Sequence, residues 1–465
     1  MLERLLRAGI NVARLNFSHG DFSSHAERIT RIRAAEQATG CRVAIMADLP
    51  GPKMRVGKIE PEPILLRPGE SFTLTSDAIV GDQRRVSMSF EPLPRVVKPG
   101  DQLFLNDGLV QLTVERVEGN DVHCKVTVGG ELRSKKGLNL PGIDLGISAF
   151  TDHDRACLEF ALQQGVDAIS QSFVETAADI VAVRAAAKAI GKQPFIIAKI
   201  ERADALNHLD KILRAADGIM VARGDLGVEV PIEGIAILQK MIIAKANRVG
   251  KPVITATQML ESMTVSRLPT RAEATDVANA ILDGTDCIML SGESAMGRYP
   301  EEAVAMLGKI AASAEAHREA ARAADTQPRP RPAPTTTVAE AASEVVEHSL
   351  LIAPTAAVFV PTRTGATARM ISRFKPTPWI VAVSADAAVC QGLVFSYGVQ
   401  PLQLAEDPPI WRDFARDWLS RHAVPGNLAM LVAGPSASNP SANHRLEFLP
   451  VGDHPALQSS GNKPQ

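Results

Sequence analysis

The sequence predicts an α/β protein built on a (β/α)8 TIM barrel, because three apolar segments near its middle each end in charged or hydroxyl residues. These segments are IIAKIE at 196–201, IMVARGDLG at 219–227 and VITATQML at 253–260. In such a barrel the C-terminal ends of the strands share one face, so side chains far apart in the sequence meet there. We therefore expect five side chains to converge at the barrel mouth: Lys199, Glu201, Arg223, Asp225 and Thr257. Together they suit a divalent cation and a phosphorylated anion.

Four more apolar runs with polar ends bring the number of expected barrel strands to seven. They lie at 11–19, 43–48, 167–173 and 286–293, and helical patterns such as 177–191 lie between them. A closed barrel of this class has eight strands. The segment 1–9, which precedes the run at 11–19, has the pattern of a helix. We therefore expect the first barrel strand to be missing at the N-terminus.

Two further domains interrupt or follow the barrel. From 53 to 136 the pattern changes to short alternating stretches with turn signals such as Asp107-Gly108, which predicts an inserted all-β lid. A Pro-rich linker at 326–337 then leads into strands and helices of a separate C-terminal α/β domain. The expected division is barrel at 1–52 and 137–325, lid at 53–136, regulatory α/β domain at 338–455 and polar tail at 456–465.

Charge and hydropathy exclude several classes of partner. The formal net charge of −2 gives no electrostatic basis for binding nucleic acid or an anionic membrane. No apolar stretch is long enough to span a bilayer, and the first residues lack the apolar core of a signal peptide. We therefore expect a cytoplasmic protein whose five scattered cysteines are reduced and packed.

Long motifs in this chain resemble those of the pyruvate kinase family. They are NVARLNFSHG, GPKMR, SKKGLNLPG, AKIE, DGIMVARGDLG, KPVITATQMLESM and PTRAEATDVANAILDGTDCIMLSGESAMG. The resemblance extends from about Leu5 to Val451. It implies transfer of a phosphoryl group from phosphoenolpyruvate to ADP, giving pyruvate and ATP, as the final step of glycolysis. It also implies Mg²⁺ or Mn²⁺ as cofactor and a homotetramer.

The resemblance implies roles for residues at the barrel mouth. Lys199 and Arg14 would act on the phosphoryl group and the developing enolate, together with Thr257. Glu201 and Asp225 match the magnesium ligands of the family. The substrate-binding residues would be Arg14, Lys199, Gly224, Asp225 and Thr257. The residues that contact the nucleotide phosphates would be Asn16, His19, Arg55 and Lys136.

Simpler alternatives exist for these residues. A Lys-x-Glu pair at a strand end is usually a surface ion pair, although its combination with the two following motifs favours catalysis. His19 or Ser18 could instead cap a helix. Arg55 and Lys136 border the lid, where basic side chains are commonly solvated.

One departure from the family pattern concerns potassium. Many members read DTKGPE, with the glutamate tied to an activating potassium ion, whereas this chain reads DLPGPK at 48–53. The remaining potassium ligands of the family match Asn16, Ser18, Asp48 and the carbonyl of Leu49. Lys53, however, places an ammonium group where the carboxylate stood, and its charge can replace that of the cation. We therefore expect a potassium-independent variant.

A loop of the C-terminal domain resembles the effector loop of the family. Its residues Thr362, Arg363, Thr364, Gly365 and Thr367 follow an expected strand and open a helix, where hydroxyl and backbone N–H groups can hold a phosphate. The effector would be a sugar phosphate or a nucleotide. The alternative is an ordinary helix cap.

Two other classes of protein compete with this interpretation. The first is a magnesium-dependent aldolase or lyase that forms pyruvate, but such an enzyme needs neither the lid nor SKKGLNLPG. The second is an inactive effector-binding protein, suggested by the missing strand. The joint presence of Arg14, Lys199, Glu201, Asp225 and Thr257 argues against it, because an inactive barrel has no chemical need for this set.

Overall fold

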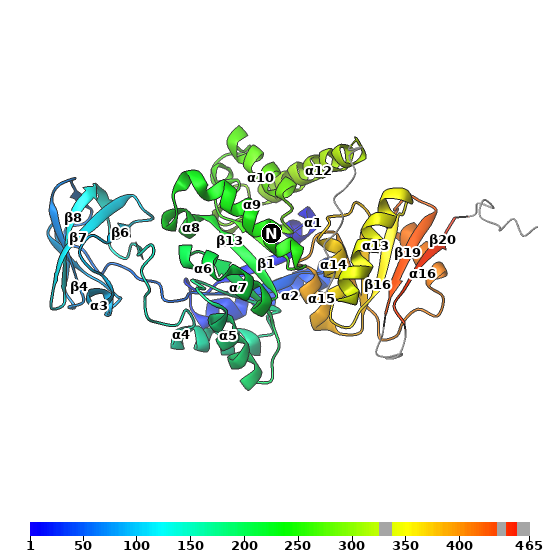
Figure 1. Ribbon diagram of the computed structural model, residues 1–465, viewed down its shortest axis with the longest axis horizontal. Helices are drawn as coiled ribbons and strands as arrows, with labels where there is room; N and C mark the ends of the chain where they lie inside the picture. The colour runs from blue at the N-terminus through cyan, green and yellow to red at the C-terminus, as the bar shows by residue number, and fades with distance from the viewer. Residues whose placement is uncertain (325–336, 435–442, 453–465) are drawn as a thin grey trace, which may run out of the picture.

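The computed structural model describes residues 1–324, 337–434 and 443–452. Figure 1 shows three bodies in a row, with the β lid at one end, the barrel in the centre and the C-terminal α/β domain at the other end. Apart from Thr337, the expected Pro-rich linker lies outside the described residues, and so does the polar tail. Within the described ranges, no helix has the length and apolar character needed to cross a membrane.

The barrel contains one sheet of parallel strands, which confirms the seven strands predicted from the sequence. Their order is β1-β2-β11-β12-β13-β14-β15, so β1 and β15 form its two edges in the described part of the chain. The strands are β1 (Val12–Asn16), β2 (Ala44–Leu49), β11 (Ala168–Gln171), β12 (Phe195–Ile200), β13 (Gly218–Ala222), β14 (Val253–Ala256) and β15 (Cys287–Ile288). The segment expected to be helical before β1 is α1 (Leu2–Ala8).

Alternation along these strands decides which side chains enter the barrel. In β2, Val43, Ile45 and Ala47 pack against the surrounding helices, whereas Ala44 and Met46 belong to the inner cluster. Because the side-chain period of a strand is two residues, Asp48 follows Ala44 and Met46 to the inside. By the same rule, Lys199 of β12 follows Ile197 to the inside, and Arg14 of β1 follows Val12.

Helices return the chain between the strands and surround the sheet (Figure 1). They are α2 (Phe22–Thr39), α4 (Asp152–Gln163), α5 (Ala177–Ala189), α6 (Ala203–Asn207), α7 (Leu209–Ala215), α8 (Arg223–Glu229), η1 (Ile232–Gly234), α9 (Ile235–Arg248), η2 (Glu261–Thr264), α10 (Arg271–Asp283), α11 (Gly292–Ala295) and α12 (Pro300–Ala324). The start of α2 differs from one alternative considered above. Asp21 caps it by accepting a hydrogen bond from the Ser24 amide, so the idea that His19 or Ser18 is the cap is wrong.

The lid inserted after β2 is a mainly antiparallel β structure with its own core, in which only β4 and β5 of the described strands pair in parallel. A six-stranded sheet has the order β10-β6-β7-β8-β4-β5, and β3 pairs with β9. The elements are β3 (Ile64–Leu66), β4 (Ser71–Thr75), β5 (Arg85–Ser87), α3 (Leu93–Val96), β6 (Gln102–Leu105), β7 (Val110–Glu118), β8 (Asp121–Val128), β9 (Gly130–Leu132) and β10 (Leu138–Asn139). The turn at Gly108, between β6 and β7, reaches α8 of the barrel: a Cβ placed on Gly108 would lie 3.4 Å from Val228 Cγ1.

The C-terminal domain is a five-stranded sheet in the order β18-β17-β16-β19-β20, with helices packed on it. Its elements are α13 (Val338–Ile352), β16 (Ala357–Pro361), α14 (Ala366–Ser372), β17 (Trp379–Ser384), α15 (Ala387–Leu393), β18 (Val399–Gln403), α16 (Trp411–Arg421), β19 (Leu428–Ala433) and β20 (Arg445–Pro450). The sequence segments AAVFVPT, WIVAVSA, PLQL and LAMLVAG have the pattern of the first four strands, so these strands were expected. The antiparallel edge strand β20 was not, because its RLEFLP sequence is short and partly polar.

A recurring aspartate marks the start of alternate barrel strands. Asp167 and Asp217 directly precede β11 and β13, and each accepts a hydrogen bond from a backbone amide of the neighbouring strand, at 2.7 and 2.9 Å. An arginine from a barrel helix neutralises each carboxylate. Arg33 of α2 lies 2.6 Å from Asp167, and Arg184 of α5 lies 2.9 Å from Asp217.

Asp286, the third aspartate of this series, is paired with a cation from the C-terminal domain. Asp286 precedes β15 and accepts the amide of Val253 at 3.0 Å. Its other oxygen lies 2.7 Å from Nζ of Lys375, which follows α14, and both side chains are almost fully buried, with exposed fractions of 3% and 4%. A second contact joins the domains here, because Phe395 stacks on Phe195 at the start of β12 with the ring centroids 5.1 Å apart.

We predict that Lys375→Met destabilises the protein by about 3 kcal/mol, because it leaves the Asp286 carboxylate buried without its cation. The shift in the midpoint of urea unfolding measures this loss. The matched control is Lys58→Met, which removes a lysine from an exposed pair with Glu60 and should cost less than about 1 kcal/mol. Adding Asp286→Asn to Lys375→Met should restore part of the loss. Equal effects of the two lysine substitutions would contradict the role of this pair.

Candidate active site

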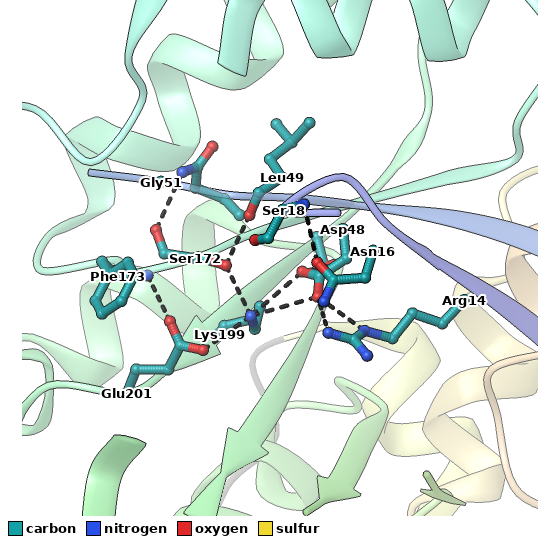
Figure 2. Close-up of polar contacts among 12 residues, drawn as sticks. Arg14, Asn16, Ser18, Asp48, Leu49, Gly51, Ser172, Phe173, Lys199 and Glu201 are labelled. Atoms are coloured by element: carbon teal, nitrogen blue, oxygen red, sulfur yellow. Dashed lines mark hydrogen bonds and ion pairs between the residues drawn. The ribbon is translucent and has the colours of Figure 1, made fainter. Parts of the chain in front are cut away.

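Lys199 is the centre of a buried charge network inside the barrel (Figure 2). Its side chain is only 7% exposed, and Glu201 is 2% exposed, so the alternative of a surface ion pair is wrong. The Lys199 ammonium lies 2.8 Å from Oε1 of Glu201 and 3.3 Å from Oδ1 of Asp48. It also donates a hydrogen bond of 2.7 Å to the Ser172 hydroxyl. These three oxygen partners hold the ammonium at the C-terminal end of β12.

Asp48 joins this lysine to Arg14 on β1. Arg14 donates from Nε at 2.8 Å and from Nη2 at 2.5 Å to Oδ2 of Asp48. The Ser170 hydroxyl donates to Oδ1 of the same carboxylate at 2.7 Å. Asp48 is 1% exposed, so both of its oxygens are satisfied within the protein. Two cations, Arg14 and Lys199, therefore share one fully buried carboxylate.

The network determines the protonation states of its members. Burial alone would lower the pKa of Lys199. The negative charges of Asp48 and Glu201 have a larger effect than burial, and they raise this pKa above its ordinary value. Burial likewise opposes the charge on Asp48, whereas Lys199 and Arg14 lower the pKa of that carboxyl below its ordinary value. At neutral pH the lysine is an ammonium ion and the aspartate is a carboxylate.

Glu201 and Asp225 form a pair of acidic groups next to Lys199. Glu201 accepts the Phe173 amide at 2.7 Å on the oxygen that does not face Lys199. Asp225 lies in the first turn of α8, where burial and the negative charge of Glu201 raise its pKa to about 6. Within the described ranges, no cluster of three or more acidic, histidine or cysteine side chains could hold a metal. Two carboxylates nonetheless fit magnesium, which binds through one or two carboxylates and completes its shell with water and phosphate.

Gly224 and Thr257 lie beside this acidic pair. A Cβ placed on Gly224 would lie 3.5 Å from Cγ2 of Thr257 and 3.7 Å from its hydroxyl. Gly224 is exposed and begins α8 with Arg223, so the amides of this first turn are available to an anion. Arg223, also expected at the mouth, binds the Thr257 carbonyl and the Asp276 carboxylate.

The four residues expected to contact the nucleotide are divided between barrel and lid. Asn16 ends β1, and its side-chain oxygen accepts the Ser18 amide at 3.1 Å. His19 is exposed just beyond it. On the lid, Arg55 donates to the Lys135 carbonyl at 2.7 Å, and Lys136 is half-buried on the adjacent segment. The structure therefore places Asn16 and His19 at the mouth, and Arg55 and Lys136 where the two lid connections run side by side.

Three of the four groups expected to bind potassium, those of Asn16, Asp48 and Leu49, have other partners. Asn16, Ser18, Asp48 and Leu49 lie close together in Figure 2. The Asp48 carboxylate is occupied by Arg14 and Lys199, and the Leu49 carbonyl accepts the Ser172 hydroxyl at 2.7 Å. The charge of Lys53 acts on Asp225, where it opposes the rise in pKa that burial and Glu201 cause.

The expected effector loop lies between β16 and α14. Its backbone amides are partly bonded within the loop, because Gly365 donates to the Thr362 hydroxyl at 2.9 Å and Ala366 donates to the Thr364 hydroxyl at 3.4 Å. Arg363 and Thr364 are exposed, and Thr367 is half-buried.

Three partners of the central network were missed by the sequence analysis. They are the hydroxyls of Ser170 and Ser172 and the backbone amide of Phe173. Phe173 has a positive φ of 56°, which directs its amide toward Glu201. The alternation of the SQS segment at 170–172, within the expected strand, could have indicated the two serines, but the sequence has no signal for the amide.

Comparison with known proteins identifies the family of the chain. The family models "Pyruvate kinase, barrel domain" and "Pyruvate kinase, alpha/beta domain" match residues 1–304 and 336–439. A pyruvate kinase of Thermococcus litoralis is 48% identical over 407 residues, which are 87% of this chain and 86% of the relative. One of Geobacillus stearothermophilus is 39% identical over 467 residues, 97% of this chain and 78% of the relative.

A solved structure agrees with these matches. The crystal structure of a pyruvate kinase from Cryptosporidium parvum superposes with a TM-score of 0.87 at 34% identity, covering 97% of this chain and 93% of that one. The two family models together describe a barrel and a C-terminal α/β domain, as the structure of this chain does. The chain belongs to the pyruvate kinase family.

Proposed function

We propose that the chain transfers the phosphoryl group of phosphoenolpyruvate to ADP with Lys199 at the centre of the reaction. The bond between phosphorus and the enol oxygen breaks, a bond to a terminal ADP oxygen forms, and the enolate left behind takes a proton at its methylene carbon to give pyruvate. Negative charge therefore moves from the phosphoryl group to the enol oxygen. The observation that carries the proposal is the buried, permanently charged ammonium of Lys199, held at an open strand end by three oxygens. Such a preorganised charge stabilises a transition state without reorganisation.

Arg14 and the acidic pair complete the surroundings of the phosphoryl group. Arg14 is 24% exposed while it holds Asp48, so its guanidinium can also meet the phosphoryl oxygens. Glu201 and Asp225 would hold the divalent cation, Mg²⁺ or Mn²⁺. When bound, this cation supplies Lewis-acid stabilisation of the phosphate and enolate oxygens. The proximity of the two carboxylates, expressed in the raised pKa of Asp225, supports this assignment.

The carboxylate of phosphoenolpyruvate would bind between α8 and the end of β14. Gly224 and Asp225 offer the first-turn amides of α8, and Thr257 offers its hydroxyl. The hydroxyl would lie 3.7 Å from a Cβ on Gly224, which is close enough for both to face one small anion. The absence of a side chain at Gly224 leaves room for that anion.

The nucleotide would lie between the barrel mouth and the lid. Asn16 and His19 would meet its phosphates from the barrel, and Arg55 and Lys136 from the lid. Lid closure over the mouth would exclude water from the transfer. The contact of Gly108 with α8 shows that the tip of the lid already reaches the barrel.

Five further assignments belong to the same proposal. The enzyme does not require potassium, because Lys53 supplies a positive charge where other family members hold the ion. The loop with Thr362, Arg363, Thr364, Gly365 and Thr367 binds a sugar-phosphate or nucleotide effector. The enzyme works as a homotetramer in the cytoplasm. The domain limits expected from the sequence are the lid at 53–136 and the regulatory domain at 338–455, and the pairing of β10 (Leu138–Asn139) with β6 favours a lid that extends slightly beyond 136.

We predict that Lys199→Met lowers kcat about 1,000-fold or more, with the KM for phosphoenolpyruvate changed only slightly, because the lost charge acts mainly in the transition state. Steady-state assay of pyruvate formation, with and without ADP and Mg²⁺, measures both constants. Lys188→Met, which changes an exposed lysine of α5, is the control and should behave as wild type. A raised KM with preserved kcat would show that Lys199 only binds substrate.

We predict that metal affinity falls as the pH falls through about 6, because the carboxylate form of Asp225 binds the cation and the protonated form does not. At pH 5 the dissociation constant of Mn²⁺ should be about tenfold larger than at pH 8, as expected for one proton and a pKa near 6. Electron paramagnetic resonance of free Mn²⁺ measures this constant without any turnover. Asp225→Asn should bind the metal weakly and lose this pH dependence. An affinity independent of pH in the wild type would remove Asp225 from the metal site.

We predict that activity in potassium-free buffer equals that in potassium chloride, when a bulky organic cation keeps the ionic strength constant. Lys53→Glu should create a potassium requirement, seen as a saturable rise in kcat of about tenfold or more, because it removes one positive charge from the pocket and adds a negative one. Lys58→Glu, at another exposed lysine of the same segment, is the control. A many-fold potassium activation of the wild type would contradict this role of Lys53.

A further inference from the structure

We infer that Arg223 is a positioning residue that holds the backbone of Thr257 in the conformation needed to bind the substrate carboxylate. The inference rests on the proposed role of Thr257 and extends it to a side chain that does not itself touch the substrate. In the backbone after β14, Thr257 and Gln258 both have positive φ angles, 70° and 52°. A β-branched residue rarely adopts this left-handed conformation, so the surroundings must impose it.

The guanidinium of Arg223 donates hydrogen bonds to two backbone carbonyls of the turn at Thr257. Nη2 donates to the Thr257 carbonyl at 2.7 Å, and Nε donates to the Ala256 carbonyl at 3.2 Å. Two successive carbonyls are therefore held by one rigid, planar fork. A lysine could not do this, because its ammonium is a single point of donation on a flexible chain.

The fork is itself held in place by α10 and α9. Asp276 of α10 accepts from Nη1 through Oδ1 and from Nη2 through Oδ2, both at 2.7 Å. Gln239 of α9 accepts from Nη1 at 3.2 Å. With both ends of the guanidinium bound, Arg223 has little freedom to rotate, and its side chain is 13% exposed. The position of the turn at Thr257 is therefore fixed relative to α9 and α10 of the barrel.

A second side chain holds the same turn from its amide side. Glu293 is 3% exposed and accepts the Leu260 amide at 3.1 Å and the Ser291 amide at 2.7 Å. Both ends of the segment 257–260 are thus bonded to side chains that come from other elements. Such bonding is expected where a disfavoured backbone has a function, because an unconstrained loop would relax.

Arg223 also connects the two halves of the proposed carboxylate site. It is the first residue of α8, directly before Gly224 and Asp225, and its side chain reaches the carbonyl of Thr257. Arg223 is therefore the described side chain that links the α8 amides directly to the backbone of Thr257. Loss of the fork would let the turn relax and move the hydroxyl away from the amides.

The test is a double-mutant cycle between Arg223→Lys and Thr257→Ala, read as the KM for phosphoenolpyruvate and for ADP. Arg223→Lys should raise the KM for phosphoenolpyruvate about tenfold and leave the KM for ADP unchanged, since only the carboxylate contact is disturbed. In the Thr257→Ala background, the same substitution should add less than about twofold, because the hydroxyl that Arg223 positions is already gone.

The matched control is Arg33→Lys. Arg33 also forks onto an aspartate and two backbone carbonyls, those of Val43 and Gly165, but at the opposite end of the barrel. It should lower stability without changing either KM. Hydrogen exchange of the amides at 257–260 gives a second readout, and it should accelerate in Arg223→Lys and not in Arg33→Lys.

Two outcomes overturn the inference in distinguishable ways. In the first, the fold-change in the KM for phosphoenolpyruvate of the double variant equals the product of the fold-changes of the two single variants, or Arg223→Lys raises the KM for ADP as much as that for phosphoenolpyruvate. Either result would show that Arg223 does not act through Thr257. An unchanged KM for phosphoenolpyruvate in Thr257→Ala alone would instead remove Thr257 from the proposed substrate site. Should Arg223→Lys fail to fold, Asp276→Asn loosens the same fork from its other end. It should then raise the KM for phosphoenolpyruvate selectively, and an unchanged KM would overturn the inference.

Discussion

The site depends on one interaction, the sharing of the buried Asp48 carboxylate between Arg14 and Lys199. A single buried charge costs several kcal/mol to desolvate, so neither cation could stay inside the barrel without a counter-charge. Asp48 supplies it from β2, between the strands that carry the two cations, and Glu201 adds a second carboxylate beside Lys199. The parallel order β1-β2-β11-β12 brings these residues together, because the side chains at alternate positions all enter the barrel.

The mouth also uses backbone that has left the regular strand conformation. Phe173 after β11 and Thr257 after β14 both have positive φ angles, and each presents a polar group to the site. The Phe173 amide binds Glu201, and the Thr257 carbonyl is held by Arg223. Rigid strands therefore place the charged side chains, while the irregular residues beyond them supply the directed hydrogen bonds. The cost of these conformations is met by the packed barrel around them.

The sequence predicted the barrel well because its signals are local. Apolar runs that end in polar residues identified all seven strands, and strand parity would have indicated Ser170 and Ser172. Four features were not predicted. The pairing of Asp48 with Arg14 and Lys199 depends on the order of strands, and the Phe173 amide has no side-chain signal. The edge strand β20 is too polar to stand out, and it is stabilised by its pairing with β19. The cap of α2 at Asp21 was missed because Ser18 is equally plausible by residue type.

The salt bridge between Asp286 and Lys375 limits how the domains of this protein can be exchanged. At β11 and β13 the barrel neutralises its own aspartates, but at β15 it borrows a cation from the next domain. A foreign domain fused after α12 would restore the length of the chain and leave a buried carboxylate without a partner. We therefore expect recombination at the interdomain connection to preserve stability only when the incoming C-terminal domain brings a cation to this position. The two domains are distinct in the fold, but this buried ion pair couples the sequence of one domain to that of the other.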